Sequence, residues 1–156
     1  MKFGVFDHMD DRGVPLGQLY SDRLALAEAY DRSGLYGYHL AEHHSTPLGC
    51  AASPGLFLAA MAQRTSRLRF GPLVYLLPFY HPLRLIEEIC MLDQMSGGRF
   101  ELGIGRGVSP FETRPTASIS ARRERSITRP SSSFSRASLR MSCRSKASII
   151  DFTRCR

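Results

Sequence analysis

The 156-residue sequence contains no tryptophan, and all of its 13 glycines lie before residue 112. It has no apolar run near the roughly 18 residues that a membrane-spanning helix requires. The N-terminus has no long apolar core followed by a small-residue cleavage site, which is the pattern of a secretory signal peptide. The sequence therefore predicts neither a membrane protein nor a secreted one, and we expect a cytoplasmic location.

The four cysteines lack the spacing of a metal site or of a redox motif. Cys50, Cys90, Cys143 and Cys155 form no C-x-x-C pair, and such pairs are common in zinc sites and redox motifs. Free or buried thiols in a reducing compartment are the ordinary interpretation. We therefore expect free thiols and no bound metal.

The net charge of +7 is distributed unevenly along the chain. Residues 1–112 carry 10 Lys and Arg against 12 Asp and Glu, whereas residues 113–156 carry 11 against 2. Eleven of the last 44 residues are serine, and none of them is glycine. A stretch with so few apolar residues cannot bury enough surface to offset the entropy of ordering. We predict one domain at 1–112 and a disordered basic tail at 113–156.

Two interpretations of this tail stay open. Its arginines and serines could bind an anionic partner such as nucleic acid through charge. The protein would then be a non-catalytic interaction module. Alternatively, the abrupt change in composition at residue 113 is typical of a frame-shifted translation of GC-rich coding sequence, which would leave the preceding domain truncated.

Strand and helix patterns alternate along residues 1–112. Strands are expected at 2–6, 36–40, 68–77 and 99–104, and helices at about 16–33, 54–65 and 82–95. The first helix is expected to bury a face of Leu16, Tyr20, Leu24, Ala27 and Tyr30. This alternation favours a parallel sheet built from βαβ units. A doubly wound sheet and a (β/α)8 TIM barrel both begin in this way.

Polar residues follow each expected strand, which favours the barrel. They are Asp7, His8, Glu42, His43, His44, His81 and Arg106. The carboxyl ends of parallel strands share one face, and in barrels that face carries the active site. Because a barrel needs at least about 200 residues, we expect only its first half, with four strands and three helices. The fourth strand would then lack a neighbour on one edge.

Glu42, His43 and His44 form a dense group of titratable side chains directly after the second strand. Imidazole exchanges protons near neutral pH, and a neighbouring carboxylate can orient it through a ring N–H. His43 and His44 are therefore candidate catalytic residues, with a pair of loop histidines as the alternative. No third ligand is spaced to support a metal site.

Two further segments allow two interpretations each. Residues 103–107 (GIGRG) could bind a phosphate through backbone N–H groups and Arg106, or their glycines could serve a tight turn for steric reasons. The aromatic residues Tyr75, Phe79 and Tyr80 could line an apolar pocket or pack in the core. The His81-Pro82 pair is typical of a helix start.

Five segments, in this order, resemble the luciferase-like monooxygenase family, close to the branch of the bacterial luciferase α chain. They are FGVF (3–6), AEHH (41–44), HPLR (81–84), LDQMSGGRF (92–100) and GIGRG (103–107). The resemblance covers about residues 1–112. It implies a (β/α)8 barrel that binds FMN, reduced by a separate reductase, and that oxygenates an organic substrate such as a long-chain aldehyde with O2. Related enzymes use a deazaflavin, but the Glu-His-His motif resembles the FMN branch more. Assembly as a homo- or heterodimer is also expected.

The resemblance also implies roles for single residues. His43 matches the family's active-site histidine, which acts in acid–base chemistry. Leu73 and Val74 match the place of a non-prolyl cis peptide bond under the flavin ring, and Arg106 matches an arginine near the flavin phosphate. Gly105 stands where luciferase has a cysteine, which indicates a different reactivity. Because much of the cofactor site belongs to the other half of the barrel, we expect this chain to bind FMN weakly and to turn over little.

Overall fold

The computed structural model describes residues 1–107 and the backbone of residues 148–151. In chain order its elements are β1 (Gly4–Asp7), α1 (Leu16–Ser33), β2 (Gly37–Leu40), α2 (Pro54–Arg64), β3 (Arg69–Pro72), β4 (Tyr75–Leu76), the 3-10 helix η1 (Leu77–Phe79), α3 (Pro82–Met95), β5 (Glu101–Gly105) and β6 (Ser148–Asp151). The sheets β1-β2-β3 and β4-β5-β6 are both parallel. A parallel bridge between Phe70 and Phe100 joins them.

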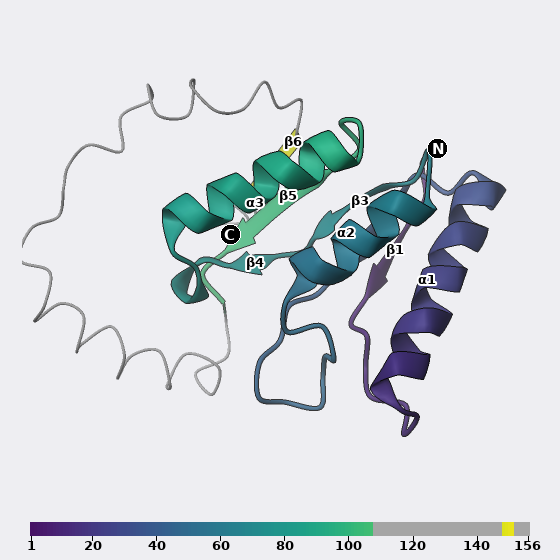
Figure 1. The fold of residues 1–156 in the computed structure, drawn as a ribbon, viewed down its shortest axis with the longest axis horizontal. Coiled ribbons are helices and arrows are strands. Elements are labelled where there is room, and N and C mark those ends of the chain that lie inside the picture. Colours follow the sequence, from purple (N-terminus) through teal and green to yellow (C-terminus); the bar gives the residue numbers. More distant parts are fainter. Residues whose placement is uncertain (108–147, 152–156) are drawn as a thin grey trace, which may run out of the picture.

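The core lies between the strands and the helices, with α2 over β3 and α3 over β5 (Figure 1). Because side chains alternate along a strand, every second residue faces this core. Tyr38, Phe70 and Phe100 are fully buried in it. The residues that alternate with them, such as His39 and Glu101, lie on the opposite side of the sheet, where they contact each other.

The predicted signals for helix ends agree with the structure. Gly34 ends α1 in the left-handed conformation, with φ of 80°, which glycine adopts without a steric cost. Ser53 and His81 are the N-cap residues of α2 and α3, although neither side chain makes a capping hydrogen bond. The predicted buried face of α1 is wrong at its start, since Leu16 is 51% exposed and Leu19 is buried instead.

The third predicted strand, 68–77, is wrong as a continuous element. It divides into β3 and β4, with Leu73 and Val74 between them. Pro72 has no N–H to donate to the neighbouring β5, so the ladder cannot continue there. The Leu73 N–H instead donates to the carbonyl of Leu40 in β2, at 2.7 Å, and pairing with β5 resumes at Tyr75.

The prediction that the fourth strand lacks a neighbour is also wrong. β5 pairs with β6 in a register that runs from Glu101 opposite Ser148 to Ile104 opposite Asp151. Adjacent isoleucines at 149 and 150 suit a strand, and an open strand edge offers backbone groups to bind one. Sequence reasoning misses β6, because it lies in the segment expected to be disordered. The rest of that segment, with its frame-shift and anionic-partner interpretations, lies outside the described residues.

The two cysteines within residues 1–107 differ in state. Cys50 is a free thiol, as expected, whereas Cys90 is disulfide-bonded. The expectation of free thiols is therefore wrong for Cys90. In the part of the chain that the structure describes, no helix combines the length and the apolar character needed to cross a membrane.

Candidate functional site

Glu42 is the centre of a group of side chains at the carboxyl ends of the strands. Its Oε1 lies 2.7 Å from Nε2 of His44, and its Oε2 accepts hydrogen bonds from the Leu76 N–H at 3.1 Å and the Tyr80 hydroxyl at 2.9 Å. The Glu42 side chain is fully buried, and a buried carboxylate requires such partners. We call Glu42, His44, Leu76 and Tyr80 the Glu42 cluster.

The ends of three strands hold this cluster in place. The Ala41 N–H donates to the carbonyl of Asp7 at the end of β1, at 2.9 Å. The hydrogen bond from Leu73 to Leu40 ties the end of β2 to the segment that leads into β4. The Glu42 side chain therefore extends from a backbone that is fixed on both sides and reaches the Leu76 N–H at the end of β4.

Burial sets the protonation state of the cluster. Burial raises the pKa of the Glu42 carboxyl above its ordinary range, and the hydrogen bonds from His44, Leu76 and Tyr80 oppose that rise only in part. Burial and the nearby Glu42 charge also raise the pKa of the Tyr80 hydroxyl, so that it remains a donor. The hydrogen bond to His44 therefore starts from a carboxyl that burial favours in its protonated form.

Replacing Glu42 with glutamine is expected to weaken the dependence of stability on pH. Because the folded pKa lies above the ordinary 4.5, the folded protein keeps a proton that the unfolded chain has lost, and stability falls as pH rises through the folded pKa. The glutamine variant lacks this proton. Free energies of unfolding in urea, measured at about pH 5 and about pH 8, should therefore differ less in E42Q than in the parent chain. The exposed Glu87, changed to glutamine, is the control; an equal change in both variants would contradict the assignment.

His43 has different surroundings from His44. Its ring stacks on that of His8, with centroids 5.7 Å apart and planes 11° from parallel. The loop backbone at Gly49 packs against it, and a Cβ at that position would lie 3.1 Å from Cβ of His43. The predicted orientation of an imidazole by Glu42 is therefore found at His44, and the two candidate histidines occupy separate environments.

The candidate cofactor residues lie beside the Glu42 cluster. The peptide bond between Leu73 and Val74 is cis, at the position that the resemblance implies. Gly105 faces Val74, because a Cβ at Gly105 would lie 2.7 Å from Cγ2 of Val74. The clash that a larger side chain would make with Val74 is thus enough to explain why glycine occupies position 105. Arg106 follows it and is exposed.

The three aromatic residues after β3 divide between core and site. The Tyr75 hydroxyl donates to Oε1 of Glu88 at 2.8 Å, and its ring is fully buried, so it belongs to the core. The ring of Phe79 lies 4.3 Å from that of His44, and Tyr80 donates to Glu42. Sequence reasoning missed Tyr80 as a partner of Glu42; its place a few residues after a strand end, next to His81, is the signal that could have found it.

Comparison with known proteins agrees with this architecture. The family model for luciferase-like monooxygenases matches residues 1–129. The chain is 62% identical over 112 residues to the uncharacterized protein y4wF of Sinorhizobium fredii. It is 36% identical over 115 residues to the oxygenase component of the flavin-dependent trigonelline monooxygenase of Acinetobacter baylyi. Both alignments cover 72% of this chain, but 33% and 32% of the respective relative.

A solved structure gives the same result for the fold. The oxygenating constituent of 3,6-diketocamphane monooxygenase from Pseudomonas putida, in complex with FMN, matches with a TM-score of 0.71 and 32% identity. The match covers 74% of this chain and 32% of that one, so the chain spans about a third of the length of these relatives. The likeness confirms the predicted fold class, part of a (β/α)8 barrel. The chain belongs to the luciferase-like monooxygenase family.

Proposed function

We propose that this chain supplies the first strands of an FMN-dependent monooxygenase and that the Glu42 cluster lies in its active site. The observation that carries the proposal is the buried Glu42 carboxyl 2.7 Å from the His44 imidazole. This pair lies at the carboxyl ends of parallel strands, where barrel enzymes have their active sites. The family match supports an oxygenation as the reaction.

The residues at these strand ends fit FMN in their chemistry. Leu73 and Val74 offer half-buried apolar surface next to β4, which suits a flat aromatic ring. Gly105 allows the end of β5 to pack closely against Val74. The exposed guanidinium of Arg106 and the N–H of Gly107 provide donors for a phosphate.

When bound, reduced FMN supplies the two electrons that, with two protons, allow one atom of O2 to enter the substrate and the other to leave as water. The protein's part is to hold and move protons. His44 shares one with Glu42 at Nε2, and Tyr80 and the Leu76 N–H fix the carboxyl that orients it. His43 is the second candidate for acid–base chemistry, positioned by its stack on His8.

The partners in this proposal are an organic substrate, for which an aldehyde is the first candidate, O2 and a flavin reductase. The trigonelline relative is named as an oxygenase component, which supports a separate source of reduced flavin. We propose FMN rather than a deazaflavin because the camphane relative is in complex with FMN.

FMN added to this chain is expected to shift the NMR signals of backbone amides at 41–45, 73–76 and 105–107. The affinity is expected to be weak, because this chain matches only about a third of the length of its relatives. Changing Arg106 to glutamine should lower the affinity for FMN about tenfold, since a charge-assisted hydrogen bond to phosphate is lost. Riboflavin, which has no phosphate, should bind both forms equally.

The matched control is Arg84→Gln, which removes an arginine whose side chain is 82% exposed on α3. It should leave FMN affinity unchanged. Saturating FMN that shifts none of the amides near the Glu42 cluster would overturn the proposal. If R106Q lost as much affinity for riboflavin as for FMN, Arg106 would not be a phosphate ligand.

A further inference from the structure

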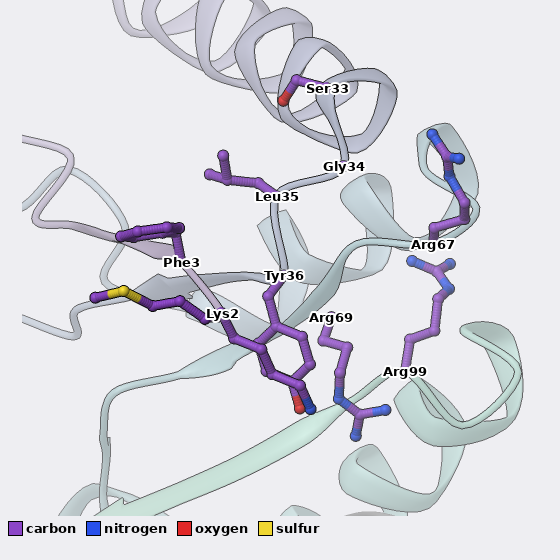
Figure 2. A pocket seen from close by; sticks show the side chains of 10 residues that line it. Lys2, Phe3, Ser33, Gly34, Leu35, Tyr36, Arg67, Arg69 and Arg99 are labelled. Atoms are coloured by element: carbon purple, nitrogen blue, oxygen red, sulfur yellow. The ribbon is translucent and has the colours of Figure 1, made fainter.

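A basic pocket opens at the edge of the sheet opposite the Glu42 cluster. It has a volume of about 580 Å³, which is in the range of small-ligand sites. Its walls include Lys2, Phe3, Tyr36, Arg67, Arg69 and Arg99 (Figure 2). These residues precede or begin strands β1, β2, β3 and β5. The basic pocket is therefore at the amino ends of the strands, a full strand length from the candidate active site.

Among the cations of the basic pocket, Arg99 has a structural role, because its donors bind groups of the protein itself. Its guanidinium donates to the carbonyls of Ala62, Leu68 and Ser96, and to the hydroxyl of Thr65, at 2.8–2.9 Å. All of its nitrogens are thus engaged with the protein. Arg99 contributes charge to the wall of the basic pocket, and its donors hold α2 to β5.

Arg67 and Arg69 use only part of their donor capacity. Arg67 donates from Nη2 to the carbonyls of Asp31 and Arg32, and Arg69 donates from Nε to Glu101 at 2.6 Å. Among the residues that the structure describes, Nε and Nη1 of Arg67 and both terminal nitrogens of Arg69 have no hydrogen-bond partner. Each of these two guanidinium groups therefore retains two nitrogens whose N–H groups can donate to a ligand.

The charge of the basic pocket is not balanced by the carboxylates around it. The pocket walls carry four cationic side chains and no acidic one. Two carboxylates nearby belong to other networks: Glu101, which accepts from Arg69, also binds His39, and the Asp31 carboxylate accepts backbone N–H groups. Counting both against the four cations still leaves a positive excess of two, which matches a dianion.

We propose that the basic pocket binds the phosphate group of a phosphomonoester. Guanidinium groups match the geometry of phosphate oxygens and donate to them in pairs. The ammonium of Lys2 lies 4.3 Å above the ring of Tyr36, so a third cation is held near the two arginines. The exposed ring of Phe3 and the partly exposed ring of Tyr36 provide apolar surface for the organic part of the ligand.

The test uses the full chain, with inorganic phosphate, phenyl phosphate and phenol as probes. Both phosphates are expected to shift the NMR amide signals of Leu35, Tyr36 and Arg69 in a saturable way, and phenol is expected to shift none of them. Phenyl phosphate should bind several-fold tighter than inorganic phosphate, because its ring adds apolar contact. Shifts confined to residues 113–156, whose charge also attracts anions, would overturn the proposal, as would equal shifts with phenol.

Variants separate the basic pocket from general attraction to a basic chain. Arg67→Gln should lower the affinity for phenyl phosphate about tenfold, and Arg67→Lys should lower it less, since the charge remains although the paired donors are lost. Lys2→Gln, which removes no hydrogen bond to the protein, provides a test that does not depend on folding. Arg84→Gln removes the same net charge elsewhere and should leave the affinity unchanged. Equal losses in R84Q and K2Q would overturn the proposal.

Discussion

Alanine in place of Gly71 is expected to abolish or severely weaken folding. A Cβ at this position would lie 1.7 Å from the carbonyl oxygen of Glu101, far inside any real non-bonded contact. Relief would require β3 and β5 to separate, because the clashing atom belongs to the backbone of β5. Separation would break the hydrogen bond from the Phe70 N–H to the Arg99 carbonyl and the packing of Phe70 on Phe100.

We expect a loss of at least about 3 kcal/mol in the free energy of unfolding, at the upper end of overpacking effects. Urea unfolding followed by circular dichroism measures it. The control is Gly17→Ala in the first turn of α1, where a Cβ would meet nothing within 4 Å. That variant should gain about 0.5–1 kcal/mol, because alanine restricts the unfolded chain and favours a helix. A G71A midpoint equal to that of the parent chain would refute this account of the β3–β5 contact.

Asp31 is the second position where a single change should have a large effect. It is 7% exposed near the end of α1, and its carboxylate accepts the N–H groups of Ser66, Arg67 and Leu68. Burial alone would raise the pKa of this carboxyl, but the hydrogen bonds outweigh burial and lower it to about 2. Compared with the ordinary value of 3.8, this corresponds to about 2 kcal/mol of stability when the group is ionised.

Changing Asp31 to alanine should therefore cost about 3 kcal/mol near pH 7, since three backbone N–H groups lose their acceptor. The folded pKa is depressed, so the stabilisation is present above about pH 4 and is lost as pH falls towards about 2. Urea unfolding of both forms at about pH 7 and about pH 3 should show their stabilities converging in acid. Asp22→Ala, which removes an exposed carboxyl bonded to Gln18, is the control. A difference between D31A and the parent chain that does not shrink in acid would contradict this role.

Local patterns in the sequence predict the elements that depend on local chemistry. Gly34 ends a helix because only a residue tolerant of positive φ fits there, and Pro54 and Pro82 begin helices because their missing N–H is not needed. The strand-end position of Glu42 follows from the apolar run before it. Each of these features depends on a few neighbouring residues, so the sequence shows it directly.

Features that depend on distant residues are not visible in such patterns. The apolar run at 68–77 predicts one strand, whereas the structure breaks it after Pro72, whose missing N–H faces β5. β6 pairs with a strand more than 40 residues before it, and periodicity gives no pairing partner. The contact of Tyr80 with Glu42 spans 38 residues. The sequence therefore indicates which groups are available at the site, but not that the carboxyl binds His44 rather than His43.

The hydrogen bond from the Leu76 N–H to Glu42 also limits how this site can diverge. If the side chain at position 42 did no more than orient the His44 imidazole, many other residues could replace it during evolution or design. Here the same carboxyl satisfies a backbone N–H of the neighbouring strand, so a replacement must also accept that bond in a buried position. Aspartate is shorter by one methylene, and glutamine can present only one oxygen. Position 42 therefore has few acceptable residues, and new chemistry is more readily obtained by changing the exposed or half-buried residues around it.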